Sequence, residues 1–293
     1  MIERVASKSE LRSAVAEIRR EGKTIGFVPT MGALHDGHLA LVRAARERAD
    51  VVAVSIFVNP TQFAPGEDFE RYPRRVEADL ELLDAEGVSL AFTPSVETMY
   101  AEDAQVTVEP GPLAVRWEGE VRPGHFAGVA TVVAKLLNMV RPDVAFFGEK
   151  DYQQLKIVQR MARDLDLGAV IVGVSIVRDA DGLALSSRNA YLSAEERATA
   201  LALPEALEAA AQALAWGETG GEALAQRMRE TVAERAGGAI ALDYAAVVDA
   251  ETLEHLPRVA GIARAIVAGR LGATRLIDNC ALVAPEAGTG GAP

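Results

Sequence analysis

Short apolar runs alternate with helical periodicity over the first 176 residues of the chain. The apolar runs predict strands at residues 24–28, 51–58, 88–92, 143–147 and 169–174. Apolar residues spaced three and four apart predict helices at residues 8–21, 38–49, 75–86, 128–139 and 152–165. The runs at 51–58 and 169–174 are almost entirely apolar, as expected of strands buried on both faces of a sheet. This alternation favours right-handed crossovers, and therefore a parallel sheet flanked by helices.

The pattern is less regular in the middle of the chain and changes after about residue 177. We predict a short strand at 106–108 and a long loop at 116–128. Ser193 and Glu196 form a capping box that opens a long Ala/Leu-rich helix. A further helix near 220–236 precedes strand-like runs at 240–248, 262–268 and 274–282. The predicted domains are a Rossmann-like α/β domain at 1–176, a smaller α+β domain at 177–285 and a disordered tail at 286–293.

The composition indicates a globular protein and argues against several classes of binding partner. Hydrophobic residues make up 49% of the 293 residues, yet no apolar run reaches the roughly 18 residues of a membrane helix. The start of the chain lacks the apolar segment of a signal peptide, and the single cysteine, Cys280, suits a reducing cytoplasm. The formal charge of −12 argues against nucleic acid or an anionic membrane as main partner. A small anionic substrate stays compatible, because a few local cations can dominate one site.

Residues 27–38 carry the first candidate chemistry. An apolar strand ends at Pro29, a glycine-bearing turn follows, and a helical pattern starts directly after His38. Such turns lie at the carboxyl end of the sheet, where open α/β folds bind their ligands. His35 and His38 are three residues apart in the first helical turn, and the backbone N–H groups there favour an anion. Two imidazoles beside an anion site predict phosphate chemistry; a plain helix cap is the structural alternative.

Three more loops collect polar residues, and each also has a structural interpretation. Residues 59–62 follow a strand and fit an ordinary turn as well as a ligand site. Asp151 and Gln154 have the spacing of a capping box, although capping and ligand contact can coexist. Residues 186–188 fit an inter-domain linker as well as a site. Lys150 lies before a helix N-terminus, where its ammonium and the backbone N–H groups converge on an anion.

Five motifs in order resemble those of the pantoate–β-alanine ligase family. They are Pro29-Thr-Met-Gly-Ala-Leu-His-Asp-Gly-His38, Asn59-Pro-Thr-Gln-Phe63, Arg122-Pro-Gly-His-Phe-Ala-Gly128, Gly148-Glu-Lys-Asp-Tyr-Gln-Gln154 and Leu185-Ser-Ser-Arg-Asn189. The likeness extends from about residue 20 to residue 280. His-x-Gly-His alone marks a wide superfamily of nucleotidyltransferases and class I aminoacyl-tRNA synthetases, whereas five motifs in order are specific. Leu185 departs from the Met that is common in the family, but it keeps volume and apolar character.

The resemblance implies ATP- and Mg²⁺-dependent condensation of D-pantoate with β-alanine through a pantoyl adenylate, by a cytoplasmic homodimer formed through the larger domain. The ATP-binding residues it implies are Met31, Gly32, Ala33, Leu34, His35, Asp36, Gly37, His38, Gly148, Glu149, Lys150, Asp151, Val177, Leu185, Ser186, Ser187 and Arg188. The implied catalytic residues are His38, His35, Lys150 and Arg188, with His38 as proton donor. Gln62 is implied to bind pantoate and β-alanine, and Gln154 to bind pantoate. Asp79 is a further candidate near the Mg²⁺ and phosphates.

Two other functions compete with this one. A nucleotidyltransferase of the same superfamily would release the transferred nucleotide in its product, but it would not need both Gln62 and Gln154 in these positions. A nucleotide-binding regulator with a decayed site is the non-enzyme alternative, and the intact charged motif residues argue against it. An aminoacyl-tRNA synthetase is disfavoured, because the acidic chain shows no basic anticodon-binding module.

Overall fold

The computed structural model describes residues 2–284, which divide into two units between Val177 and Arg178. The predicted tail at 286–293 lies outside the described residues. The strands of the first unit are β1 (Glu3–Val5), β2 (Ile25–Thr30), β3 (Val51–Ile56), β4 (Leu90–Phe92), β5 (Val144–Gly148) and β6 (Val170–Val174). Its helices are α1 (Lys8–Arg20), α2 (Asp36–Arg46), α3 (Val76–Ala85), α4 (Val96–Met99), α5 (Glu118–Val121), α6 (His125–Val140) and α7 (Tyr152–Asp164). Short 3₁₀ helices are η1 (Pro60–Gln62), η2 (Gly111–Ala114) and η3 (Glu149–Asp151).

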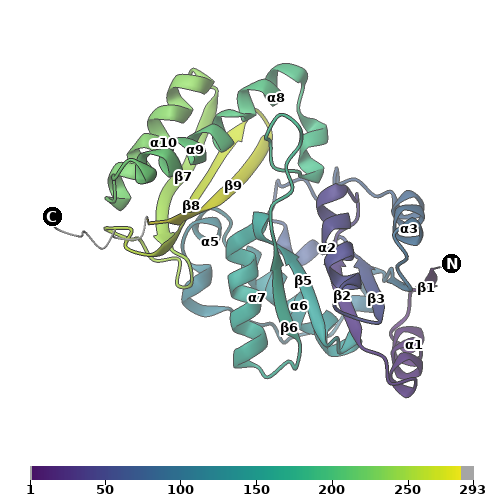
Figure 1. The fold of residues 1–293 in the computed structure, drawn as a ribbon. Helices are drawn as coiled ribbons and strands as arrows, with labels where there is room; N and C mark the ends of the chain where they lie inside the picture. Colours follow the sequence, from purple (N-terminus) through teal and green to yellow (C-terminus); the bar gives the residue numbers. More distant parts are fainter. Residues whose placement is uncertain (1, 285–293) are drawn as a thin grey trace. The chain divides into compact units, whose positions relative to one another are not determined.

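The parallel sheet of the first unit has the strand order β1-β4-β3-β2-β5-β6 (Figure 1). Strand β2 pairs with β3 on one side and with β5 on the other, so the chain order reverses beside β2. Open α/β sheets bind ligands beyond the carboxyl ends of their strands at such a reversal. The turns that follow β3, β2 and β5 therefore meet at the edge where a ligand site is expected.

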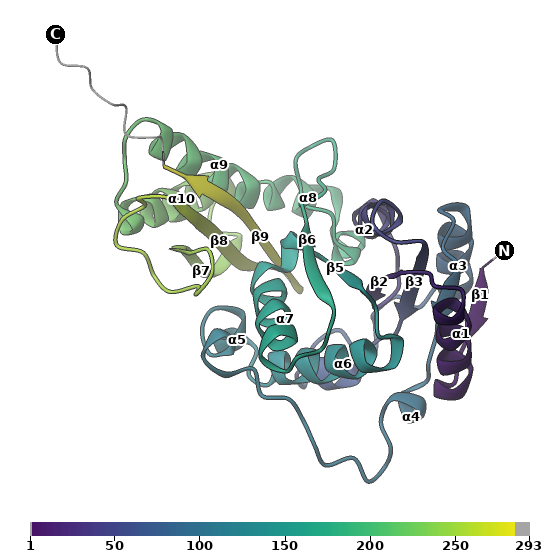
Figure 2. The ribbon, with the colours of Figure 1, turned by 60° about the horizontal axis from the view of Figure 1, so that its bottom comes forward.

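Apolar faces on helices and strands account for this layering. Strand β3 is buried at every position, as predicted from its continuous apolar run. Helices α2 and α3 share an apolar core with β2 and β3, to which Val42, Leu83 and Val54 contribute fully or almost fully buried side chains. Each such side chain contributes roughly 1.5–3 kcal/mol on burial. Figure 2 shows α6 and α7 along the opposite side of the sheet from α2 and α3.

Four local expectations are wrong. Residues 106–108 form no strand, and the predicted loop at 116–128 contains α5 and the first turn of α6. Strand β6 is only partly buried, because it forms the edge of the sheet and has one neighbour instead of two. The Ala/Leu-rich helix is interrupted near Leu201, since Pro204 has no N–H to bond to the carbonyl four residues earlier.

The second unit combines helices with an antiparallel sheet. Its strands are β7 (Ile240–Asp249), β8 (Ile262–Leu271) and β9 (Thr274–Val283), in the order β7-β8-β9. Its helices are α8 (Ala194–Ala200), α9 (Ala202–Ala215) and α10 (Gly221–Ala236), with a 3₁₀ helix η4 (Ser187–Tyr191). Helices α9 and α10 pack on each other and on this sheet (Figure 1). The predicted fold class, a parallel α/β sheet with a smaller α+β part, is confirmed. Every helix within residues 2–284 falls short of the length and apolar character that crossing a bilayer requires.

Candidate active site

The histidine turn, residues 31–38, joins β2 to α2 and uses imidazole to begin the helix. His35 is the N-cap residue, and its Nδ1 accepts the N–H of Gly37 at 3.2 Å. The N–H of His35 donates to Nδ1 of His38 at 3.3 Å, and the two ring centroids lie 4.1 Å apart. Because both Nδ1 atoms accept, each neutral ring carries its hydrogen on Nε2. Capping and the paired placement of the imidazoles therefore occur together.

His38 is uncharged at neutral pH. Burial is the main cause that lowers the pKa of His38 to about 3; the nearby His35 and Lys150 act in the same direction, and Asp151 acts in the opposite one. These influences place the loop after β5 within electrostatic reach of the ring. A neutral imidazole with its hydrogen on Nε2 can donate one hydrogen bond to an anion.

The backbone N–H groups of Gly32, Ala33 and Leu34, before the helix begins, donate to side chains of the protein. Gly32 donates to Oγ1 of Thr30 at 3.2 Å. Ala33 and Leu34 donate to the two carboxylate oxygens of Asp79 at 2.9 and 2.8 Å. The N–H groups of Gly32, Ala33 and Leu34 are therefore accepted by side chains of the protein, whereas the predicted anion site concerns the first turn of α2 and stays a prediction.

The loop after β3 is organised by Asn59, which is only 1% exposed. Its Nδ2 donates to Oε1 of Gln62 and to the carbonyl of Gly128, both at 3.2 Å, and its Oδ1 accepts the hydroxyl of Tyr100 at 2.7 Å. Gln62 also donates through Nε2 to Sδ of Met31 at 3.0 Å, which joins this loop to the histidine turn. Tyr100 was missed in the sequence, because no pattern there links it to residues 41 positions away.

The Arg122-to-Gly128 motif supports the loop that carries Gln62. Arg122 forms a bidentate pair with Glu67, at 2.7 Å to each oxygen, and lies 3.0 Å from Nε2 of His125. A guanidinium only donates, so Nε2 accepts and Nδ1–H donates to the carbonyl of Gln62 at 2.8 Å. Burial and the neighbouring Arg122 lower the pKa of His125 to about 4. At Gly128 a Cβ would lie 2.2 Å from the carbonyl oxygen of Thr61, so only glycine permits this approach.

The loop after β5 carries Lys150 within η3 and leads directly into α7. Asp151 occupies the N-cap position but makes no side-chain capping bond, so the capping-box interpretation of Asp151 and Gln154 is wrong. The adjacent Gln153 is the structural amide: it is 8% exposed, and its Nε2 donates to the carbonyls of Leu113 and Arg116 at 2.7 and 2.9 Å. Gln154 is half-buried in the first turn of α7.

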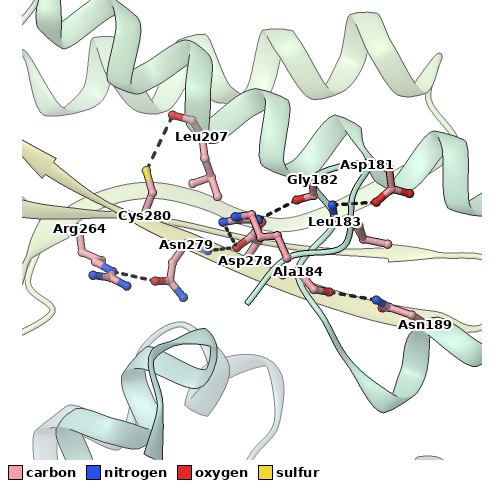
Figure 3. A network of polar contacts seen from close by, with 11 residues as sticks. Asp181, Gly182, Leu183, Ala184, Asn189, Leu207, Arg264, Asp278, Asn279 and Cys280 are labelled. Carbon is pink, nitrogen blue, oxygen red and sulfur yellow. Dashed lines mark hydrogen bonds and ion pairs between the residues drawn. The ribbon is translucent and has the colours of Figure 1, made fainter. Parts of the chain in front are cut away.

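The predicted nucleotide residues 185–188 belong to the second unit. Ser186 caps η4, because its Oγ accepts the N–H of Arg188 at 3.3 Å. Asn189 secures the same segment by donating through Nδ2 to the carbonyl of Ala184 at 3.0 Å (Figure 3). Val177, also predicted to contact the nucleotide, is the last residue of the first unit.

Two sets of ion pairs anchor the hairpin of residues 178–184 that precedes this segment. Arg178 donates to both carboxylate oxygens of Asp278 on β9, at 2.6 and 2.9 Å. Arg197 on α8 pairs with Asp179 at 2.6 Å and with Asp181 at 2.8 Å. The hairpin therefore has tethers to a strand and to a helix of its own unit, and these limit the freedom of residues 185–188.

The fold and these turns define a Rossmann-like α/β protein with paired imidazoles at the switch point of its parallel sheet. Among residues 2–284, no group of three or more His, Cys, Asp or Glu side chains is arranged to hold a metal ion. The model of the pantoate–β-alanine ligase family matches residues 3–281, and the chain belongs to that family.

Proteins named pantothenate synthetase are similar to this chain in sequence and structure over nearly its whole length. A pantothenate synthetase from Rhizorhabdus wittichii is 54% identical over 278 residues, which cover 95% of this chain and 98% of the relative. The crystal structure of pantothenate synthetase from Thermus thermophilus is similar with a TM-score of 0.91 and 49% identity, covering 97% of this chain and 100% of that one. A pantoate–β-alanine ligase from Francisella tularensis, complexed with β-γ ATP and β-alanine, has a TM-score of 0.79 and 33% identity, covering 96% of this chain and 97% of that one.

Proposed function

We propose that the chain condenses D-pantoate with β-alanine, using ATP and releasing AMP and pyrophosphate. Family membership supports the reaction, and the Francisella tularensis complex supports ATP and β-alanine as substrates. The observation that carries the proposal is the 3.0 Å contact between Gln62 and Met31, which joins a neutral amide to the histidine turn. An acid bound by the amide would lie next to phosphates bound by the imidazoles.

In the proposed mechanism, a carboxylate oxygen of pantoate attacks the α-phosphorus of ATP and pyrophosphate leaves. The amine of β-alanine then attacks the acyl carbon of the adenylate, and AMP leaves. Negative charge gathers on phosphate oxygens during the first step, so preorganised donors and cations lower its barrier. His35 and His38 donate through Nε2–H and Lys150 supplies a positive charge. Because the reacting groups all belong to the substrates, alignment is the main task of the protein.

The remaining predicted contacts stay part of the proposal. Gln62 binds pantoate and β-alanine, and Gln154 binds pantoate. The nucleotide contacts are Met31, Gly32, Ala33, Leu34, Asp36, Gly37, Gly148, Glu149, Asp151, Val177, Leu185, Ser186, Ser187 and Arg188. The support for these assignments is the order of the five motifs and, for the turn after β2 and the loops after β3 and β5, their common edge of the sheet.

We propose that Mg²⁺ arrives with the phosphates of ATP, which it neutralises when bound. When bound, Mg²⁺ would keep several waters and need only one or two protein carboxylates. Asp79 fits a direct ligand poorly, because it is 2% exposed and both of its oxygens already accept N–H groups.

We also propose, from the family resemblance, that the protein is cytoplasmic and forms a homodimer through the larger domain. Sedimentation of the purified chain tests the dimer. A monomer at micromolar concentration would contradict that part alone.

The decisive test measures pyrophosphate and AMP with ATP and pantoate, with and without β-alanine. We expect pyrophosphate release to require pantoate, and AMP release to be stimulated by β-alanine. Pyrophosphate release that does not depend on pantoate would refute the ligase. Release that needs pantoate but yields a stable nucleotide product indifferent to β-alanine would favour a nucleotidyltransferase.

A further inference from the structure

A buried carboxylate holds the histidine turn from the neighbouring helix α3. Asp79 lies in the first turn of α3 and is 2% exposed. Its Oδ2 accepts the N–H of Ala33 at 2.9 Å, and its Oδ1 accepts the N–H of Leu34 at 2.8 Å. Hydrogen bonds to an ionised acceptor are about twice as strong as neutral ones. One side chain thus fixes two successive peptide groups that lie 46 and 45 positions away in the sequence.

The backbone of the turn has a conformation that needs such an anchor. Gly32 has φ of +81° and Ala33 has φ of +51°. Left-handed backbone is uncommon for a residue with a side chain and costs conformational energy. Successive N–H groups in such a turn form a concave site for an anion. In this protein the carboxylate of Asp79 occupies that site.

We propose that Asp79 is a positioning residue, which sets the places of the two imidazoles through the backbone of the turn. The link is short, because the chain runs from Leu34 directly into His35, whose N–H donates to Nδ1 of His38. The catalytic consequence rests on the proposed ligase function, whereas the placement of the rings does not. A direct role for Asp79 in binding Mg²⁺ is the alternative that an experiment has to separate.

The substitution Asp79→Asn keeps the size of the side chain and replaces one acceptor oxygen by an NH₂ group, which faces an N–H of the turn. Glu81→Gln is the matched control, because it removes an exposed carboxylate from the same helix. We expect kcat to fall about 10²-fold in Asp79→Asn, the loss that a displacement of about 1 Å produces. The Mg²⁺ concentration that gives half-maximal rate should stay unchanged, and Glu81→Gln should behave like the original chain.

A spectroscopic measurement separates positioning from metal binding. The chain has four histidines, so their imidazole NMR signals can be assigned by single substitutions. In protein free of Mg²⁺ and nucleotide, Asp79→Asn should shift the signals of His35 and His38 and leave those of His125 and His255 in place. Unshifted signals, or a raised Mg²⁺ requirement as the only change, would overturn the proposal.

The role of Asp79 can be tested even if the ligase function fails or the Asp79→Asn variant does not fold. If the original chain releases no pyrophosphate with pantoate, the ligase function fails, while the NMR comparison still decides the role of Asp79. If Asp79→Asn does not fold, Gly32→Ala perturbs the same contact from the turn, because a Cβ there would lie 2.9 Å from Oδ2 of Asp79. The same shifts of His35 and His38 are expected, and their absence would again overturn the proposal.

Discussion

The protonation state of His38 makes the sharpest prediction about the chemistry. Its pKa of about 3 is set mainly by burial, with His35 and Lys150 acting in the same direction and Asp151 against them. At pH 7 only about 10⁻⁴ of the free protein would carry an imidazolium at this position. A step that required the charged ring would use that small fraction. We therefore expect His38 to act as a neutral donor through Nε2–H.

Two substitutions distinguish a neutral donor from a protonated acid. His38→Ala removes the donor, and kcat should fall about 10²- to 10³-fold, as for the loss of one oxyanion-hole donor. His38→Gln places an uncharged amide donor near the position of Nε2 and should keep clearly more activity than His38→Ala. His255→Gln on the exposed surface of the second unit serves as the control.

The assay is pyrophosphate release with ATP and pantoate from pH 5 to pH 9. The pH dependence of kcat/KM reports groups of the free protein and substrates. Ionisations of ATP affect both proteins equally, so they cancel when kcat/KM of the original chain is divided by kcat/KM of His38→Gln. We expect this ratio to be independent of pH. A change of kcat/KM around pH 6.5 that the original chain shows and His38→Gln does not would refute the neutral-donor mechanism. Equal loss in the Gln and Ala variants would also refute it.

Other predictions concern the substrate loop, the second unit and acid stability. Gln62→Ala should raise the KM for pantoate roughly 5- to 150-fold with a smaller change in kcat, because a buried polar ligand loses a partner worth about 1–3 kcal/mol; an unchanged KM would remove Gln62 from the pantoate site. Asp278→Ala should lower the free energy of unfolding by about 1.5–3 kcal/mol in urea titrations, since the partly exposed Arg178 loses two charged hydrogen bonds, whereas exposed Glu195→Gln should change little. A small effect of Asp278→Ala would show that solvent replaces the carboxylate. The pKa of His125 near 4 lies below the unfolded value of about 6.5, so the unfolded chain takes up the proton first and stability is lost as pH falls from about 6.5 to 4, by up to about 3 kcal/mol. His125→Gln should reduce the slope of that pH dependence, to which His38 also contributes, and an unchanged slope would contradict the assignment.

Local sequence patterns predict the helices and strands of this fold well where the burial of apolar side chains dominates. The continuous apolar run at 51–58 predicts a strand that is covered on both faces, and β3 is buried throughout. The helical spacing of apolar residues likewise predicts α1 and α7, and each of these helices buries an apolar face. The run at 169–174 is equally apolar, but β6 lies at the edge of the sheet. Strand order depends on pairing between distant segments, which the run itself does not contain.

Residue type and position after strands predict most candidate site residues, and the family resemblance adds Asp79 and Val177, but neither predicts their hydrogen-bond partners. The spacing of His35 and His38 predicts two imidazoles on one face, and they do lie side by side. Their tautomers depend on backbone N–H groups whose directions follow from the path of the turn. Gln153 and Gln154 are identical side chains next to each other in the sequence, and only the packing of the loop that contains Leu113 shows that Gln153 is structural.

By itself the sequence determined the strand and helix pattern, the parallel arrangement, the polar loops and the family to which the chain belongs. The elements follow from periodicity and turn chemistry within a few tens of residues, and the family follows from the order of five motifs between residues 29 and 189. Only the tertiary structure decided that Asp79 accepts the N–H groups of the histidine turn and that His125 supports the carbonyl of Gln62. Hydrogen bonds of this kind join residues 45 to 63 positions apart. Their partners are chosen by how the layers pack, because a buried polar group bonds to whichever neighbour the fold brings within about 3 Å.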